Sequence, residues 1–311
     1  MSTMVAVADL APLSESYTEA PTSKVVASSG TIYTYREVGD GSVPIVLFQH
    51  FRGTLDNWDP ALIDLLAAGR RVVAFNNVGV ASTTGTTPNT VEAMAHGALD
   101  FVDAMRLEHV DLLGFSLGSF VAQEVALVRP DLVRRMILAS SAPRGAAGMH
   151  GWAPDVIGAV GAPQPTPEGV LDVFFTPTPV SRAAGMQAFQ RMFTRTIDRD
   201  DATSWQTRQA QYDAICTWGI PNAGHLERLA AIHVPVFVAN GDGDRMIPPR
   251  YSHLLAGLLP NAKLTIYPDA AHGFLFQHHA EFAADVTAFL EEGDETPRSS
   301  GTSTCRDERE G

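Results

Sequence analysis

The chain of 311 residues has few cysteines and few basic side chains. Its two cysteines, Cys216 and Cys305, are far apart, so no disulfide framework is expected, and the lack of a C-x-x-C pair or a Cys/His cluster argues against a zinc site. The 22 Lys and Arg residues are scattered, and 35 Asp and Glu residues bring the net charge to −13. Nucleic acid and anionic membrane surfaces bind basic patches, so neither is expected as a partner.

Long apolar runs are missing as well. No stretch approaches the about 18 uninterrupted apolar residues that indicate a membrane-spanning helix. The N-terminal sequence "MSTMVAVADLAPLSES" has no basic start, and its apolar run is too short for a signal peptide. With 45% apolar and 18% charged residues, the composition is that of a soluble globular protein. We therefore expect a cytoplasmic protein, which could also form a homo-oligomer.

The sequence does contain a regular alternation of short apolar strands with amphipathic helices, over residues 23–143 and again over residues 233–291. This alternation predicts an α/β fold, with a mostly parallel sheet flanked by helices. Residues 144–232 interrupt it with helical patterns rich in Met, Phe and Trp, which predicts a helical cap inserted after the sixth strand. Residues 1–22 are expected to form a loose N-terminal arm, and residues 292–311, which contain few apolar side chains, a disordered tail.

A serine lies between two glycines where a predicted strand gives way to a helix, in Gly114-Phe115-Ser116-Leu117-Gly118. G-x-S-x-G in this context is the pattern of a nucleophile elbow. The sharp turn strains the serine backbone, and side chains at the flanking positions would clash with nearby backbone, which explains the glycines. The hydroxyl then lies at a helix N-terminus, where developing negative charge is favoured. The alternative is a tight strand-to-helix turn without chemistry.

A serine hydroxyl is a poor nucleophile unless a base activates it and an acid orients that base. The loop after the strand "VPVFVANG" contains Asp242 and Asp244, and the loop after the strand "LTIYP" contains Asp269 and His272. Loops at the carboxyl ends of parallel strands gather at one edge of a sheet, so these side chains can approach Ser116. The order serine, acid, histidine therefore predicts a catalytic triad, with the acid still open between the two aspartates.

The motifs "GFSLG", "NGDGDRMIP" and "PDAAHGF" together resemble the α/β-hydrolase superfamily, and the resemblance covers residues 24–291. It implies that Ser116 is the nucleophile, Asp244 the acid and His272 the base, without metal or organic cofactor. Asp242 is the rival acid, and its other role would be to cap the turn. Asp269 is expected to hold its own loop through side-chain-to-backbone bonds.

The same resemblance implies an oxyanion hole made of two backbone N–H groups. One belongs to Leu117, directly after the serine, and the other comes from the loop after "VPIVLFQ". Many family members have His-Gly in that loop, whereas this chain has His50 at the usual glycine and Phe51 at the donor position. A second departure is "FNNVGVAST", in which an asparagine, Asn76 or Asn77, replaces the acid of the family's D-x-x-G-x-G-x-S loop.

These features predict a serine hydrolase that cleaves a carboxylic ester or lactone through an acyl-enzyme. The Met, Phe and Trp residues of the predicted cap favour an apolar, bulky small molecule as substrate. A cofactor-free haloperoxidase or perhydrolase, a thioesterase or a C–C bond hydrolase would use the same triad. Serine at the elbow argues against haloalkane dehalogenases and epoxide hydrolases, which have aspartate there. The non-enzyme alternative is a ligand receptor on the hydrolase scaffold.

Overall fold

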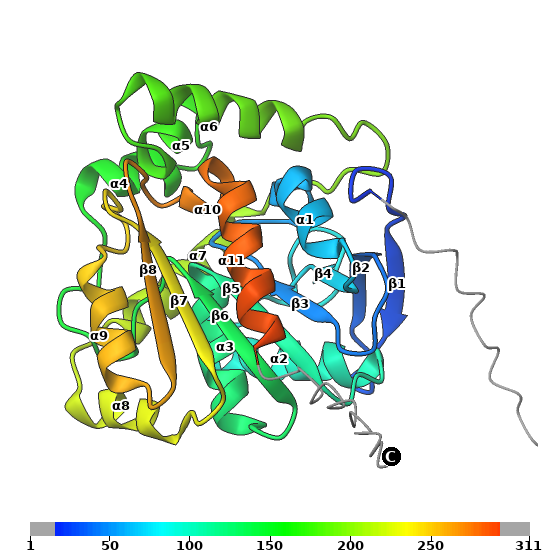
Figure 1. Cartoon of the computed structure of the whole chain (residues 1–311). Helices are drawn as coiled ribbons and strands as arrows, with labels where there is room; N and C mark the ends of the chain where they lie inside the picture. The colour runs from blue at the N-terminus through cyan, green and yellow to red at the C-terminus, as the bar shows by residue number, and fades with distance from the viewer. Residues whose placement is uncertain (1–15, 293–311) are drawn as a thin grey trace, which may run out of the picture.

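The computed structural model describes residues 16–292 and has an eight-stranded sheet at its centre (Figure 1). The strand order is β1-β2-β4-β3-β5-β6-β7-β8. Pairing is parallel from β4 through to β8, and only β1 and β2 run antiparallel to their neighbours, so the predicted mostly parallel sheet is confirmed. The strands span Ser23–Val26 (β1), Ile32–Val38 (β2), Ile45–Phe48 (β3), Val72–Phe75 (β4), Val110–Phe115 (β5), Val133–Ala139 (β6), Val236–Gly241 (β7) and Ala262–Tyr267 (β8).

Helices cover both faces of the sheet, with α1 and α11 packed together on one face and α2 and α3 on the other (Figure 1). All residues of β3, β4, β5 and β7 are buried, as expected for parallel strands between two helical layers. The helices of this part of the chain are α1 (Pro60–Ala67), α2 (Val91–Ala104), α3 (Leu117–Val128), α9 (Arg250–Leu258), α10 (Phe274–Gln277) and α11 (His279–Glu291), with the 3-10 turn η1 (Leu55–Asn57).

The chain between β6 and β7 is helical, as its sequence pattern predicts. Three of its helices begin at a proline preceded by an extended residue, and Ser or Thr side chains cap several of them, which explains why they start where they do. We call residues 144–232 the helical segment. Its elements are α4 (Pro154–Val160), α5 (Pro167–Phe174), α6 (Pro179–Met192), α7 (Trp205–Trp218), α8 (Ala223–Glu227) and the 3-10 turn η2 (Arg228–Ala231).

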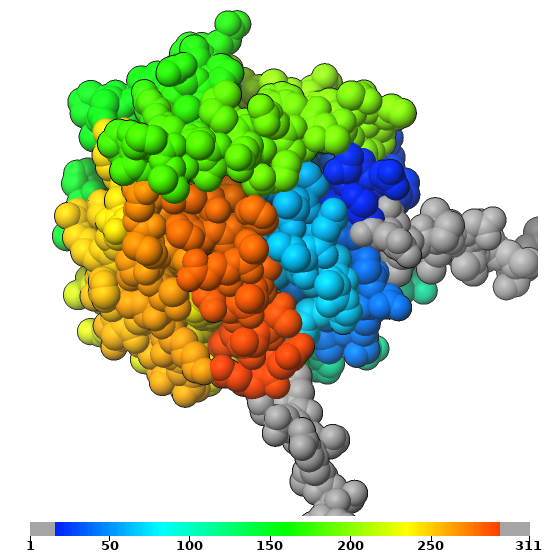
Figure 2. Space-filling model, turned by 45° about the horizontal axis from the view of Figure 1, so that its top comes forward, coloured from blue at the N-terminus to red at the C-terminus, as the bar shows by residue number. Residues whose placement is uncertain are grey.

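The helical segment lies over the loops that follow the parallel strands. The Gly273 N–H, after β8, donates to the Phe174 carbonyl at 2.8 Å. Arg191 of α6 forms two hydrogen bonds of 2.6 and 2.8 Å with Asp59, which caps α1. Figure 2 shows the part of this segment with α4 to α6 in green as a layer across one end of the molecule, whereas α8 lies at the opposite end in Figure 1. Since the predicted site residues lie in those loops, the helical segment covers them.

The N-terminal part of the chain differs from the loose arm that its sequence suggests. Residues 16–22 pack against the core: Tyr17 is 3% exposed, its N–H donates to Asp64 and its hydroxyl to the Leu55 carbonyl. The buried ring and these hydrogen bonds together hold this short segment against the core. The remainder of the predicted arm, and residues 293–311 of the predicted tail, lie outside the described residues. Within residues 16–292, no helix is both long and apolar enough to cross a membrane.

Candidate active site

Ser116 occupies a strained turn between β5 and α3. Its φ of 55° and ψ of −121° are unusual for any residue other than glycine. A Cβ on Gly118 would lie 2.0 Å from the Phe48 carbonyl oxygen, and one on Gly114 would lie 2.5 Å from the Gly118 oxygen. Both distances are far below a van der Waals contact, so only glycine lets α3 start this close to the ends of β3 and β5. The turn thus has the backbone geometry of a nucleophile elbow.

His272 and Asp244 form a buried pair. The imidazole Nδ1 lies 2.8 Å from a carboxylate oxygen of Asp244, and the two side chains are 1% and 0% exposed. The other oxygen of Asp244 accepts the N–H groups of Met246 and Ile247 at 2.8 and 2.9 Å. These bonds fix the carboxylate, and the carboxylate holds the proton on Nδ1, so that Nε2 keeps its lone pair.

His272 Nε2 is buried and has no hydrogen-bond partner among the described residues. The imidazole lies 5.2 Å, between ring centroids, from the ring of Phe115, the residue directly before Ser116. Burial of a polar atom without a partner costs free energy, and a catalytic role is one reason why such an atom is retained. A free imidazole lone pair next to a serine at an elbow can accept a proton from that serine.

The neighbouring aspartates have structural roles. Asp242 accepts the N–H groups of Asp269 and Ala270, both at 3.2 Å, and therefore caps the β8 loop, while Asp244 is the one that contacts His272. From the sequence, the Asp269 side chain is expected to bond the backbone of its own loop, and this expectation is wrong. Its carboxylate accepts the hydroxyl groups of Thr176 and Thr178 at 2.6 and 2.7 Å, and these two bonds lower the pKa of Asp269. Asp269 thus ties the β8 loop to the helical segment, which no local pattern indicates.

The loop after β3 is preorganised by the side chain of Gln49. Its amide nitrogen donates to the Thr54 carbonyl at 3.0 Å, and its oxygen accepts the His50 N–H at 2.9 Å. Among the described residues, the N–H groups of Phe51 and Leu117 donate to no protein acceptor. Two unpaired backbone donors next to the elbow are what an oxyanion hole requires.

Ser140 and Asn240, which were not among the predicted site residues, form a polar network that holds the backbone of His272. Ser140, at the end of β6, has a φ of 48°, and its hydroxyl lies 3.0 Å from the His272 carbonyl oxygen and 3.0 Å from the Asn240 side-chain oxygen. Asn240 in turn donates to the Ile247 carbonyl at 2.9 Å. This buried network joins the loops after β6, β7 and β8. Both residues are polar and lie at the carboxyl end of a buried strand, and this feature of the sequence could have indicated them as site residues.

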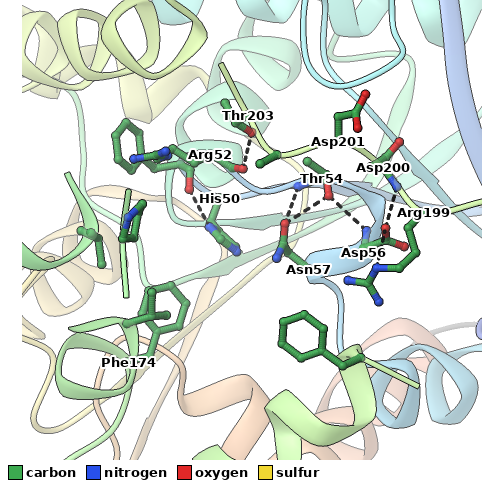
Figure 3. A pocket seen from close by; sticks show the side chains of 16 residues that line it. His50, Arg52, Thr54, Asp56, Asn57, Phe174, Arg199, Asp200, Asp201 and Thr203 are labelled. Atoms are coloured by element: carbon green, nitrogen blue, oxygen red, sulfur yellow. Dashed lines mark hydrogen bonds and ion pairs between the residues drawn. The ribbon is translucent and has the colours of Figure 1, made fainter. Parts of the chain in front are cut away.

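A cavity of about 330 Å³ lies beside the site, between the loop after β3 and the helical segment (Figure 3). His50, Phe51 and Phe174 line it, and Phe174 also contacts the His272 ring at 5.2 Å between centroids. The composition of the helical segment suggested an apolar lining, but charged side chains line this cavity as well. The charged residues there are Arg52, Asp56, Arg199, Asp200 and Asp201. Ser116 itself is 1% exposed.

The acid that was missing from the β4 loop is supplied by the helical segment. The Asn76 amide donates to the Asp200 carboxylate at 2.9 Å, and the Leu55 N–H donates to the same oxygen at 3.0 Å. Burial raises the pKa of Asp200. A carboxylate from residue 200 therefore bonds the asparagine that follows β4, and sequence order alone could not indicate this contact.

The chain is similar to known proteins both in sequence and in structure. Over 289 residues the chain is 26% identical to a non-heme chloroperoxidase from Streptomyces lividans, covering 86% of this chain and 98% of that one. It is similar in structure to an alpha/beta hydrolase fold protein from Chitinophaga pinensis, with 39% identity and a TM-score of 0.84 over 89% of this chain and 99% of that one. An enol-lactonase from Burkholderia xenovorans shares the fold, with 21% identity and a TM-score of 0.71 over 87% and 100% of the two chains.

The family model described as alpha/beta hydrolase fold matches residues 43–279, which include the elbow, the loop of Asp244 and His272. Together with the eight-stranded, mostly parallel sheet, this match shows that the chain belongs to the alpha/beta hydrolase fold family.

Proposed function

We propose that the protein is a serine hydrolase that cleaves a carboxylic ester or lactone of a small molecule. The observation that carries the proposal is the buried pair of His272 and Asp244, whose imidazole packs against Phe115, directly before the strained Ser116, and whose Nε2 has no partner among the described residues. A histidine held by a carboxylate on one side and free on the other is the arrangement that activates a hydroxyl nucleophile.

In the proposed mechanism the Ser116 hydroxyl attacks the carbonyl carbon of the substrate, and its proton passes to His272 Nε2. The N–H groups of Phe51 and Leu117 stabilise the negative oxygen of the tetrahedral intermediate. When the intermediate collapses, His272 returns the proton to the leaving alcohol oxygen, and an acyl-enzyme remains. Water then attacks the acyl carbon and passes one proton to His272, which returns it to the Ser116 oxygen as the carboxylic acid leaves.

We propose that the helical segment acts as a lid that shapes the substrate pocket. Ser116 is 1% exposed beneath it, so the segment has to move for a substrate to enter. The phenyl rings of Phe51, Phe174 and Phe193 line the adjacent cavity and favour a bulky apolar group on the substrate. The charged side chains that line the same cavity favour a polar group on the same molecule.

A second candidate is a perhydrolase, supported by the 26% identity to a non-heme chloroperoxidase. Hydrogen peroxide would replace water in the attack on the same acyl-enzyme, and the peracid released would oxidise halide. The proposed residues and their roles would be unchanged, so the two candidates differ only in the second nucleophile. Bromination of an acceptor that requires both acetate and peroxide would favour this candidate.

Covalent labelling tests the proposed nucleophile directly. A fluorophosphonate should inactivate the protein and add to Ser116 alone, as located by mass spectrometry, while the Ser116→Ala variant should remain unlabelled and inactive. Release of a chromophore from p-nitrophenyl esters of increasing acyl length should stop in parallel with labelling. A protein that stays unlabelled would be a receptor on the hydrolase scaffold, and an adduct on another residue with loss of activity would refute the assignment of Ser116.

A further inference from the structure

His50 is a second imidazole next to the proposed site, and the proposed mechanism does not use it. It directly precedes Phe51, the proposed oxyanion donor, and its ring contacts Phe115 and Phe174 at 5.1 and 5.5 Å between centroids. His272 contacts the same two rings at 5.2 Å each. The two imidazoles therefore lie around one pair of phenyl rings.

One ring nitrogen of His50 forms a hydrogen bond within the protein. Nδ1 lies 2.8 Å from the Phe51 carbonyl oxygen, which can only accept, so Nδ1 carries the proton and donates it. This bond closes a small ring over the peptide that follows the oxyanion donor, while the His50 N–H is held by Gln49. The orientation of the imidazole and its tautomer are thereby set.

The other nitrogen of His50 has no partner within residues 16–292, and it is not among the fully buried polar atoms of the molecule. His50 lines the cavity of about 330 Å³, and Figure 3 shows its ring between Phe174 and Asn57. With the proton on Nδ1, Nε2 presents a lone pair to this cavity and has no hydrogen to donate. Burial lowers the pKa of His50 to about 4, so the ring stays neutral at physiological pH.

A neutral acceptor that lines a partly open cavity discriminates between ligands by their hydrogen-bond donors. A hydroxyl or N–H group of the substrate can bond to Nε2, whereas an ether oxygen, a carbonyl or a carboxylate would face its lone pair. A site built to bond a donor rejects the analogue that lacks it, because the protein's polar atom then stays unpaired after water has been displaced.

We infer that His50 contacts the substrate and selects esters or lactones that carry a hydroxyl or N–H group close to the reacting carbonyl. The two groups that would contact the substrate, the Phe51 N–H and the His50 side chain, belong to consecutive residues. The Phe51 N–H would hold the carbonyl oxygen, and the preceding side chain would hold the donor on a neighbouring carbon. This inference rests on the proposed function and specifies its substrate class.

Matched substrates test the inference. Phenyl esters of butanoic acid are compared with their 2-hydroxy, 3-hydroxy, 2-methoxy and 3-methoxy derivatives, since methoxy has similar polarity but no donor. For the wild-type protein we expect kcat/KM of at least one hydroxy ester to exceed that of its methoxy counterpart about tenfold or more. Dividing each hydroxy-to-methoxy ratio by the ratio of the two rates of alkaline hydrolysis without protein cancels differences in intrinsic ester reactivity.

His50→Asn retains an amide group near Nδ1 but has no atom at the position of Nε2, so the preference for the hydroxy ester should fall to about one. His50→Gln reaches the position of Nε2 with its amide oxygen and should keep most of the preference, which a merely structural role would not predict. A wild-type protein without preference, or a preference that survives in His50→Asn, would overturn the inference.

If no ester is hydrolysed and a fluorophosphonate fails to label Ser116, the proposed function is refuted, and this inference is refuted with it. If Ser116 is labelled but hydroxy and methoxy esters react alike, the proposed function stands and only the role of His50 is refuted.

Discussion

Asp242 and Asp244 are two residues apart in one turn, yet their carboxylates have different partners. Asp244 bonds His272 and two N–H groups and is 3% exposed, whereas Asp242 bonds only the N–H groups of the β8 loop. In an elbow-and-loop site of this kind, the partner of the histidine keeps the imidazole in its reactive tautomer. The chemical role of each aspartate is therefore decided by which group it bonds.

Substitution of each aspartate by asparagine separates the two roles. Asp244→Asn should lower kcat roughly 10⁴-fold, because an amide that donates to Nδ1 leaves the reactive lone pair on the wrong nitrogen. Asp242→Asn keeps one acceptor oxygen for the loop, so its activity should stay within about threefold, while the free energy of unfolding falls by about 1 kcal/mol. Ester hydrolysis and urea unfolding of both variants measure these effects. A larger loss of activity in Asp242→Asn would exchange the two assignments.

At the scale of elements, polar contacts join the helical segment to the core in several places. Arg191 on α6 bonds Asp59 at the start of α1, Asp269 bonds Thr176 and Thr178, and Asp200 bonds Asn76. Asp59 has a fully buried side chain, whereas the Arg191 side chain is 28% exposed. Polar contacts of this kind fix the position of the segment and can be broken without exposing a large apolar core, which suits a lid.

Removal of the Arg191 side chain should therefore destabilise the protein. Arg191→Met leaves the Asp59 carboxylate buried without its cation, and we expect a loss of about 2 kcal/mol in the free energy of unfolding. Arg182→Met is the control, because Arg182 lies on the same helix and pairs with Asp172, whose side chain is 50% exposed. Such a surface pair contributes less than about 1 kcal/mol. Urea unfolding measures both losses. Equal losses in the two variants would mean that the ion pair between Arg191 and Asp59 contributes no more to the free energy of unfolding than an exposed pair does.

At the scale of the whole molecule, charged groups are buried between the helical segment and the first half of the sheet. Arg36 and Asp56 form an ion pair at 2.7 Å with side chains 1% and 5% exposed, and the Asp200 N–H donates to Asp56. Burial is the largest cause of the raised pKa of Asp200, and the negative charge of Asp56 adds to it. A raised carboxyl pKa means that the folded protein binds this proton more tightly than the unfolded chain does. The stability contributed by this group is complete below the ordinary pKa of aspartate and is lost as pH rises through the folded pKa.

Asp200→Asn removes this ionisation and should make stability less dependent on pH. Between pH 4 and pH 8 the Tm of the variant relative to wild type should rise, by roughly 2 °C, because only the wild type has to bury a carboxylate at the higher pH. Asp201→Asn, at the exposed neighbouring position, is the control and should show no such trend. Thermal unfolding followed by circular dichroism at both pH values measures the difference. A relative Tm that falls with pH would show that Asp200 is stabilised as a carboxylate.

The amino-acid sequence by itself was sufficient for the features that depend on local backbone chemistry. The alternation of buried strands and helices determines the mostly parallel sheet, because both faces of each central strand must be apolar. The glycines on either side of Ser116 are required by a turn in which a Cβ would lie 2.0 or 2.5 Å from backbone atoms, so the motif carries its own geometry. The apolar strands that precede Ser116 and His272 are also visible in the sequence, so the positions of both residues in loops after strands could be predicted from it.

Only the tertiary structure decided which distant groups meet. It brought Asp244 rather than Asp242 to His272, directed Asp269 to hydroxyl groups of the helical segment, and brought Asp200 to Asn76, 124 residues earlier in the chain. It also packed Tyr17 against the core and left one nitrogen of His50 open to a cavity. The orientation of a side chain and its hydrogen-bond partner depend on loops that fold back from separate parts of the chain. No periodicity or local motif records those contacts, because their energies arise only once the helical segment lies on the sheet.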